Sequence, residues 1–310
     1  MRLFWKVYIV RQREMNRMKK KVKIGRLVLP YAMVLPVMIL LAVFVFYPVI
    51  NMVYLSFFDY NLLKEKVFCG WDNYYRIFFV QTDFVDALTN TIIYMVCVTF
   101  FLIFLGLVFA LWLQKDDKIT AIAQRAMFFP HLCSMLAVSL IFQWLMDDEG
   151  LFNSVLSFLN LTPIRWLNSS ATSLLSVMIV AIWKGMGYQA LILLSAVKSI
   201  PKELVEAAAL DDAGKLRTFF KITLPMLSPQ LFFMLITITI NSFQVFDAVR
   251  LMTSGGPGNS SDVLVYWIYR YAMEYNKYGL ACAGGTILLI ILCFLTFIYF
   301  RVVDKRVHYQ

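Results

Sequence analysis

The side chains best suited to binding chemistry are polar groups that interrupt long apolar stretches. Asn241, Ser242 and Gln244 stand next to Phe243 near the end of one such stretch. Their amide and hydroxyl groups can exchange hydrogen bonds with sugar hydroxyls, and an aromatic ring can pack on the apolar face of a sugar. The same polar groups can instead bond to neighbouring helices. No nucleophile–base pair, metal-ligand cluster or carboxylate dyad accompanies them in the sequence, so they indicate binding and not catalysis.

A second polar interruption lies in the apolar stretch 174–197, where Lys184 is the only charged residue. Three roles are open for Lys184: it can meet an anionic substrate, pair with Asp247, or extend its amine toward the membrane surface. His131 follows Pro130 in another apolar stretch and is either a packing residue or a cavity residue. The five cysteines are scattered and build neither a disulfide framework nor a CxxC metal pair.

The composition requires that membrane helices position these groups. Hydrophobic residues make up 61% of the 310 residues and charged residues 15%, whereas soluble proteins are about 45–50% apolar and about 25% charged. Mean hydropathy is +0.71. Since a membrane-crossing helix needs roughly 20 mostly apolar residues, we expect an all-α polytopic membrane protein with a basic tail at 1–26 and a transmembrane domain at 27–310. The six predicted spans are about 28–50, 88–113, 123–146, 173–197, 229–252 and 279–301, and residues 151–161 are predicted to form an amphipathic surface helix.

Lysine and arginine are unequally distributed between the two sides of these spans. Twenty-one of the 29 fall in the N-terminal tail, the second and fourth loops and the C-terminal tail, and six fall on the other side. Because basic loops stay in the cytoplasm, both termini are predicted to be cytoplasmic. The net charge of +10 is therefore a topology signal and not a sign of nucleic-acid binding, although the basic tail can touch anionic lipid. The first span is too long for a cleaved signal peptide.

The predicted cytoplasmic loop 198–228 reads as a helix–turn–helix. Pro201 suits a first helical turn, and Lys202 to Leu210 consists of strong helix formers. Asp211, Asp212 and Gly214 interrupt this helix, and a second helical stretch from Lys215 to Thr223 is expected to stop at Pro225. From the residues alone, the loop is either a capped linker between spans or a docking element.

This loop contains Glu206-Ala207-Ala208, then Asp211, then Ile222-x-Leu224-Pro225 and Pro229. This pattern resembles the EAA motif of permease subunits in bacterial ABC importers. In that family the motif forms a coupling helix that sits in a cleft of the ATP-binding subunit. The sequence departs from the family at Asp212, where a glycine is usual, but Asp is among the few residues that tolerate a left-handed backbone. The residues that the resemblance assigns to coupling are Glu206, Ala207, Ala208, Asp211, Asp212, Ile222, Leu224 and Pro225.

Other segments resemble the carbohydrate branch of the same family. Residues 56–61 and 70–74 look like the first external loop of maltose-type permeases, and residues 251–258 look like the Gly-Gly-Pro loop after the fifth span. The short basic tail after Phe300 resembles the first of the two permeases in such importers. By this resemblance, the residues expected to contact the solute are His131, Gly185, Tyr188, Asn241, Ser242, Phe243 and Gln244.

The resemblance implies a type I ABC importer permease in the bacterial cytoplasmic membrane that moves a sugar or oligosaccharide. The implied partners are a second permease subunit, a dimer of ATP-binding subunits, an extracytoplasmic solute-binding protein and membrane lipid. No GxxxxGK[ST] phosphate loop occurs in the sequence, so ATP and Mg are expected to be used by the partner ATPase, with no cofactor in this chain.

Three alternatives remain open. A permease of the same family could carry another solute, such as glycerol phosphate. An ion-coupled secondary transporter is disfavoured, because no pair of broken spans repeats across two halves and no carboxylate relay lies within the spans. A membrane scaffold without transport would leave the polar groups at 241–247 unexplained.

Overall fold

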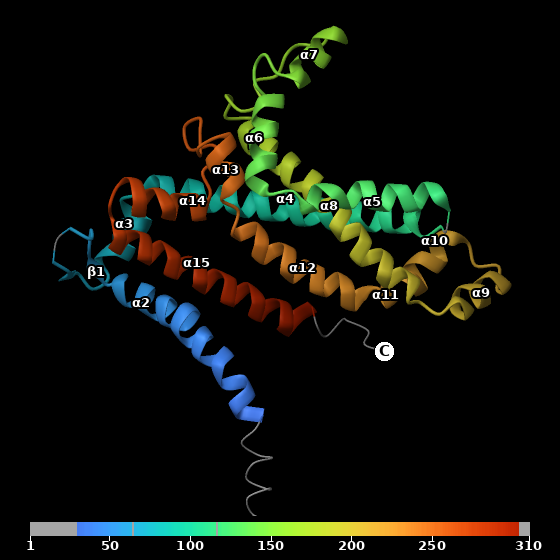
Figure 1. The fold of residues 1–310 in the computed structure, drawn as a ribbon, viewed down its shortest axis with the longest axis horizontal. Coiled ribbons are helices and arrows are strands. Elements are labelled where there is room, and N and C mark those ends of the chain that lie inside the picture. Colours follow the sequence, from blue (N-terminus) through green and yellow to red (C-terminus); the bar gives the residue numbers. More distant parts are fainter. Residues whose placement is uncertain (1–29, 64, 116, 304–310) are drawn as a thin grey trace, which may run out of the picture. The chain divides into compact units, whose positions relative to one another are not determined.

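The computed structural model describes residues 30–63, 65–115 and 117–303, so the basic tail at 1–26 lies outside the described residues. The chain divides into two units, residues 1–54 and 55–310. In the first unit, the apolar helix that begins at Pro30 contains a π-helical segment, Ala42–Phe46, and continues as α2 (Tyr47–Leu55) (Figure 1). This helix of 26 residues is long enough to cross a bilayer.

The second unit contains four further helices that are long and apolar enough to span a membrane. They are α4 (Thr82–Leu113), α8 (Ser173–Lys198), α12 (Ser228–Phe243) with its continuation α13 (Asp247–Met252), and α15 (Tyr278–Ile298). Long helices therefore lie at five of the six predicted spans, which confirms the all-α membrane fold.

The third predicted span is not one helix. The chain forms α5 (Lys118–Leu132) and α6 (Met135–Leu145), which are bent by 98° (Figure 1). Cys133 and Ser134 leave the helical conformation, with ψ angles of 144° and 138°. Pro130 removes one amide donor from the turn before them. The segment predicted as a span at 123–146 therefore consists of two helices with a break between them. Hydropathy does not reveal the break, because it responds to composition and not to local backbone torsions.

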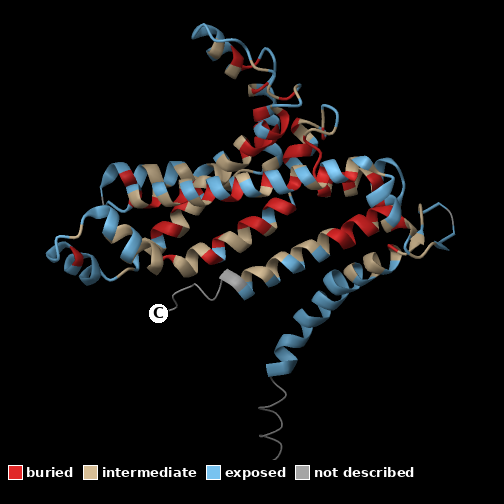
Figure 2. Cartoon of the chain, turned by 180° about the vertical axis from the view of Figure 1, so that it is seen from behind, coloured by how far each residue is buried: buried red, intermediate tan, exposed pale blue. Residues whose placement is uncertain are grey.

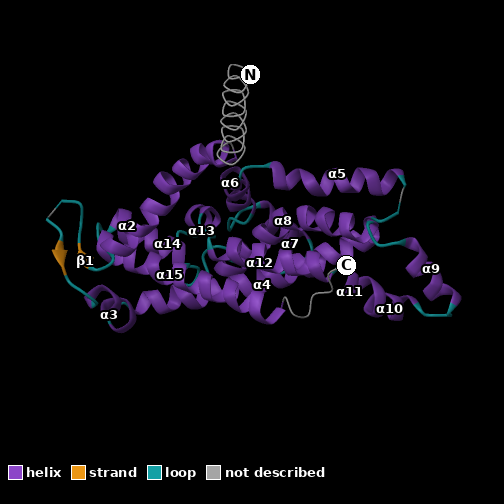
Figure 3. Cartoon of the chain, turned by 90° about the horizontal axis from the view of Figure 1, so that it is seen from below, coloured by secondary structure: helices purple, strands orange, loops and turns teal. Residues whose placement is uncertain are grey.

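Short elements complete the second unit. At one end of the bundle lie the antiparallel strands β1 (Phe58–Asp59) and β2 (Val67–Phe68), paired as Phe58 with Phe68 and Asp59 with Val67, together with α3 (Asp72–Phe79). At the opposite end lie α9 (Lys202–Leu210), α10 (Lys215–Thr218) and α11 (Leu224–Met226) (Figure 3). The remaining elements are α7 (Leu151–Phe158), α14 (Leu264–Tyr269) and the π-helical segments Phe219–Thr223, Arg270–Glu274 and Tyr299–Val303.

The core of the second unit lies where α4, α5, α8 and α12 face one another. Buried residues concentrate on these facing sides, and exposed residues cover the outer sides (Figure 2). α8 closely approaches α5, because a Cβ on Gly187 would lie 1.8 Å from the carbonyl oxygen of Met127. Only glycine permits that approach. A second buried cluster joins α3, the start of α4, α14 and α15 around Trp267.

Asn73 and Gly279 fix the chain that leads from β1 to the bundle. The buried Asn73 side chain donates to the carbonyl oxygens of Ser56 and Phe58 at 2.8 and 2.9 Å. A Cβ on Gly279 would lie 1.9 Å from the Phe58 oxygen, and the Gly279 amide donates to the Tyr60 oxygen at 3.0 Å. These contacts join the 56–61 and 70–74 segments to each other and to the start of α15.

Candidate functional site

The predicted solute residues of the fifth span occupy the last turn of α12, just before the helix breaks. The backbone N–H of Gln244 donates to the backbone carbonyl oxygen of Asn241 at 3.1 Å, and regular helix resumes only at Asp247. Asn241 and Gln244 are exposed, whereas Ser242 and Phe243 are 4% and 2% exposed. Successive helical residues are rotated by 100°, so the four cannot share one face. The structure places Ser242 and Phe243 inside the subunit and leaves Asn241 and Gln244 accessible.

His131 and Tyr188 come together although they lie on different helices. Their rings are stacked with centroids 4.2 Å apart and an interplanar angle of 4°. His131 belongs to the last turn of α5, and Tyr188 is an exposed residue of α8. Gly185 lies one turn earlier, where a Cβ would lie 3.0 Å from a methyl group of Leu102, so Gly185 allows α8 to approach α4. The solute contacts of these three residues stay predictions.

Lys184 does not pair with Asp247. Its Nζ donates to the backbone oxygen of His131 at 3.1 Å, and among the residues that the structure describes it forms no ion pair. The last carbonyls of a helix have no partner in their own helix, and a cation near them is stabilised by the helix dipole. The break after α5 creates such free carbonyls, which explains why Lys184 is drawn there.

The 198–228 loop presents α9 with most of its surface exposed. Glu206 and Ala207 are exposed, and Ala208 is buried. Asp212 has a φ of +50°, which is the left-handed conformation expected from its departure from the family pattern. The large apolar side chains on the exposed surface of the loop are Leu204, Val205, Leu210, Leu216 and Phe220.

The second helix of this loop does not stop at Pro225. After α10 it passes through the π-helical segment Phe219–Thr223 and continues as α11, which contains Leu224 and Pro225. A π-helical turn changes which carbonyl each amide meets. Proline has no amide hydrogen and is tolerated in the first turn of a helix, and Pro225 lies in the first turn of α11. Ile222 and Leu224 are half-buried along this stretch.

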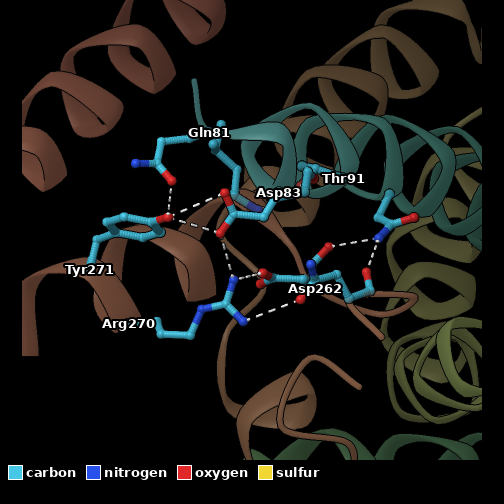
Figure 4. A network of polar contacts seen from close by, with 10 residues as sticks. Gln81, Asp83, Thr91, Asp262, Arg270 and Tyr271 are labelled. Carbon is cyan, nitrogen blue, oxygen red and sulfur yellow. Dashed lines mark hydrogen bonds and ion pairs between the residues drawn. The ribbon is translucent and has the colours of Figure 1, made fainter. Parts of the chain in front are cut away.

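A polar network joins the start of α4 to the segment around α14 (Figure 4). Arg270 donates to Asp83 at 3.2 Å and to Asp262 at 2.5 Å. Tyr271 donates to Gln81 at 2.6 Å and also contacts Asp83. Burial raises the pKa of Asp262 to about 7, and the neighbouring Arg270 opposes that rise. Burial and the Asp83 charge raise the pKa of Tyr271.

Comparison with known proteins identifies the family. Residues 82–309 match the model of the binding-protein-dependent transport system inner membrane component. The chain belongs to this family. It is 34% identical over 270 residues to the probable ABC transporter permease protein YurN of Bacillus subtilis, covering 85% of this chain and 92% of that protein.

Two further comparisons agree with this assignment. The permease is 31% identical to the sulfoquinovosyl glycerol transport system permease protein SmoG of Agrobacterium fabrum, covering 96% of this chain and 97% of that protein. Its fold matches a bacterial ABC transporter involved in the import of the acidic polysaccharide alginate, with a TM-score of 0.78 at 24% identity over 92% of this chain and 99% of that one. The permease therefore has the type I ABC importer permease fold.

Sequence reasoning did not find the Arg270 network or the stacking of His131 on Tyr188. Arg270 and Asp83 are 187 residues apart in the permease, so no local spacing could pair them. The one usable sign was that Asp83, Asp262 and Arg270 are charges close to apolar segments, where an ionised group needs a partner.

Proposed function

We propose that this permease forms half of a two-permease pore and moves a sugar or oligosaccharide. The observation that carries the proposal is the exposure of Asn241 and Gln244 in the second half of an apolar span. Uncharged amides at that depth are costly against lipid and suit a path for a solute rich in hydroxyl groups. The names of the similar proteins support this class, since one is a sulfoquinovosyl glycerol permease and another belongs to an alginate importer.

Energy for transport comes from a dimer of partner ATPases that bind ATP and Mg. The exposed α9 docks into them, and the small Ala207 allows close contact. Leu204, Val205 and Leu210 supply apolar surface that the described residues of this chain leave uncovered. An external solute-binding protein delivers the sugar at the opposite end of the bundle, and both termini lie in the cytoplasm, as the basic loops favour.

The test is uptake by the complete importer in proteoliposomes, with its binding protein and ATP. We expect ATP-dependent uptake of at least one labelled sugar from a panel of mono-, di- and trisaccharides, both neutral and acidic. Ala207→Arg should abolish uptake while leaving the amount of permease in the membrane unchanged. Gly214→Ala is the matched control in the same loop, because a Cβ there meets nothing within 4 Å. Normal uptake by Ala207→Arg would refute the docking of α9, and absence of sugar uptake would refute the substrate class.

A further inference from the structure

Exposed polar side chains continue beyond the predicted solute residues of the fifth span. Asn241, Gln244, Asp247 and Arg250 recur at intervals of three, and all four are exposed. In an uninterrupted helix, three steps of 300° would turn Arg250 about 180° away from Asn241. The break between Phe243 and Asp247 removes that constraint and restarts the helix with its charged residues exposed.

Arg250 is held over an aromatic surface. Its guanidinium carbon lies 4.6 Å from the centre of the Tyr269 ring and 5.7 Å from the Phe246 ring. Phe246 and Tyr269 contact each other with centroids 5.0 Å apart, and Tyr266 stacks beside Tyr269. A cation over ring faces at these distances is stabilised by the ring quadrupole. Arg250 is therefore positioned before any ligand arrives.

The side-chain hydrogen-bonding groups of Arg250 and Asp247 are free to bind a ligand. In the described part of the chain, neither Arg250 nor Asp247 forms an ion pair, and the guanidinium of Arg250 donates no hydrogen bond. An arginine offers five donors in a planar fork, and a carboxylate offers acceptors to hydroxyl groups. Both charges lie in a helix whose composition suits the membrane, where such groups face water or a polar ligand and not lipid.

We propose that Arg250 and Asp247, with the rings of Phe246 and Tyr269, form a second sugar subsite in this permease. The fork of Arg250 binds two adjacent oxygens of a glycosyl unit, Asp247 accepts from its hydroxyls, and an exposed ring edge packs on its apolar face. Asn241 lies in α12, whereas Arg250 lies in α13, beyond the break. The subsite therefore binds a glycosyl unit other than the one at Asn241, so it selects oligosaccharides. This inference rests on the proposed function.

The first experiment measures chain-length selectivity. The complete importer in proteoliposomes receives labelled maltotriose, arabinotriose and a mannuronate trisaccharide, each compared with its monosaccharide. For the imported trisaccharide, Arg250→Gln and Asp247→Asn should each raise KM about 10- to 100-fold, while KM for the monosaccharide stays within twofold. Arg165→Gln, another exposed arginine outside the spans, is the matched control and should leave both values unchanged.

The second experiment tests access to Arg250 without assuming a sugar. In a variant without native cysteines, Arg250→Cys should react with an impermeant thiosulfonate reagent, and the imported trisaccharide should slow that reaction at least fivefold. Val249→Cys is the buried control and should not react. Import of a trisaccharide with unchanged KM in Arg250→Gln, or an unreactive Arg250→Cys in an assembled importer, would overturn the subsite alone. Import of a monosaccharide but of none of the three trisaccharides would also overturn the subsite alone. Import of no sugar from the whole panel would overturn the proposed function and the subsite with it.

Discussion

Replacing Arg270 with methionine is expected to destabilise the permease strongly. The cause is a buried carboxylate that loses its cation, and not lost packing. Arg270 lies between Asp83 and Asp262, and its side chain is 13% exposed. The Asp262 side chain is fully buried, and its Oδ1 atom has no hydrogen-bond partner among the described residues. Without Arg270, Asp262 would keep its place in the interior but lose the cation that compensates its charge.

The magnitude follows from this burial. Removing one partner of a buried ion pair costs about 3–5 kcal/mol, because the other charge is left unpaired. Neutralising that charge should recover most of the loss, so Arg270→Met combined with Asp262→Asn should be clearly more stable than Arg270→Met alone. Arg76→Met is the matched control. Its partner is Asp72 at 2.7 Å, but the two side chains are 47% and 42% exposed, and exposed pairs contribute about 0–1 kcal/mol.

Thermal unfolding of the purified complex in detergent measures the difference. A loss of 1 kcal/mol lowers Tm by about 2–4 °C for chains somewhat smaller than this one. Arg270→Met should therefore lower Tm by about 6–20 °C and Arg76→Met by no more than about 4 °C. Equal Tm values for the two single variants would refute the reasoning. Failure of Asp262→Asn to rescue Arg270→Met would show that packing, and not an unpaired charge, accounts for the loss.

Three further predictions concern the titration of Asp262, the contact of Gly187 with α5 and the membrane topology. The pKa of Asp262 is raised from 3.8 to about 7, so between these pH values the folded state holds a proton that the unfolded state has released. The free energy of unfolding should therefore fall by up to about 4 kcal/mol as the pH rises from 4 to 7. Asp262→Asn should flatten the profile of Tm against pH, and an unchanged slope would contradict this. Gly187→Ala should abolish recovery of monodisperse complex, because its Cβ would lie 1.8 Å from a backbone oxygen of α5, whereas Gly214→Ala should have no effect. An impermeant thiol reagent applied to intact cells should label Ser170→Cys and not Lys215→Cys in a variant without native cysteines, and the reverse pattern would overturn the predicted topology.

The long helices were predictable because each membrane span must satisfy all its backbone groups over roughly 20 apolar residues. This constraint leaves a signal in composition alone, which five spans retain. The bend between α5 and α6 leaves no such signal in hydropathy. The stretch stays mostly apolar despite Pro130 and Ser134, and the change consists of two backbone torsions. A hydropathy sum is the same for a straight helix and for one bent by 98°.

The candidate site was predictable only where polarity alone marks a residue. Asn241 and Gln244 stand out from their apolar surroundings, and a spacing of three already separates them from Ser242. Polarity did not single out the partners of His131 and Arg250 in the sequence. Tyr188 and Tyr269 reach them from other helices, and those crossings depend on close approaches such as that of Gly187 to α5.

The two breaks in the spans give the strongest structural argument for where a solute passes. Irregular backbone at membrane depth persists only where protein or water satisfies its polar groups. His131 lies beside the break after α5, and Gln244 lies at the break after α12. The helices that follow the two breaks, α6 and α13, pack against each other. At the first break, Lys184 donates to the backbone carbonyl oxygen of His131. At the second break, Gln244 stays exposed. Two breaks that lead into one helix pair, with an exposed polar side chain at one of them, support the proposed polar path through this subunit.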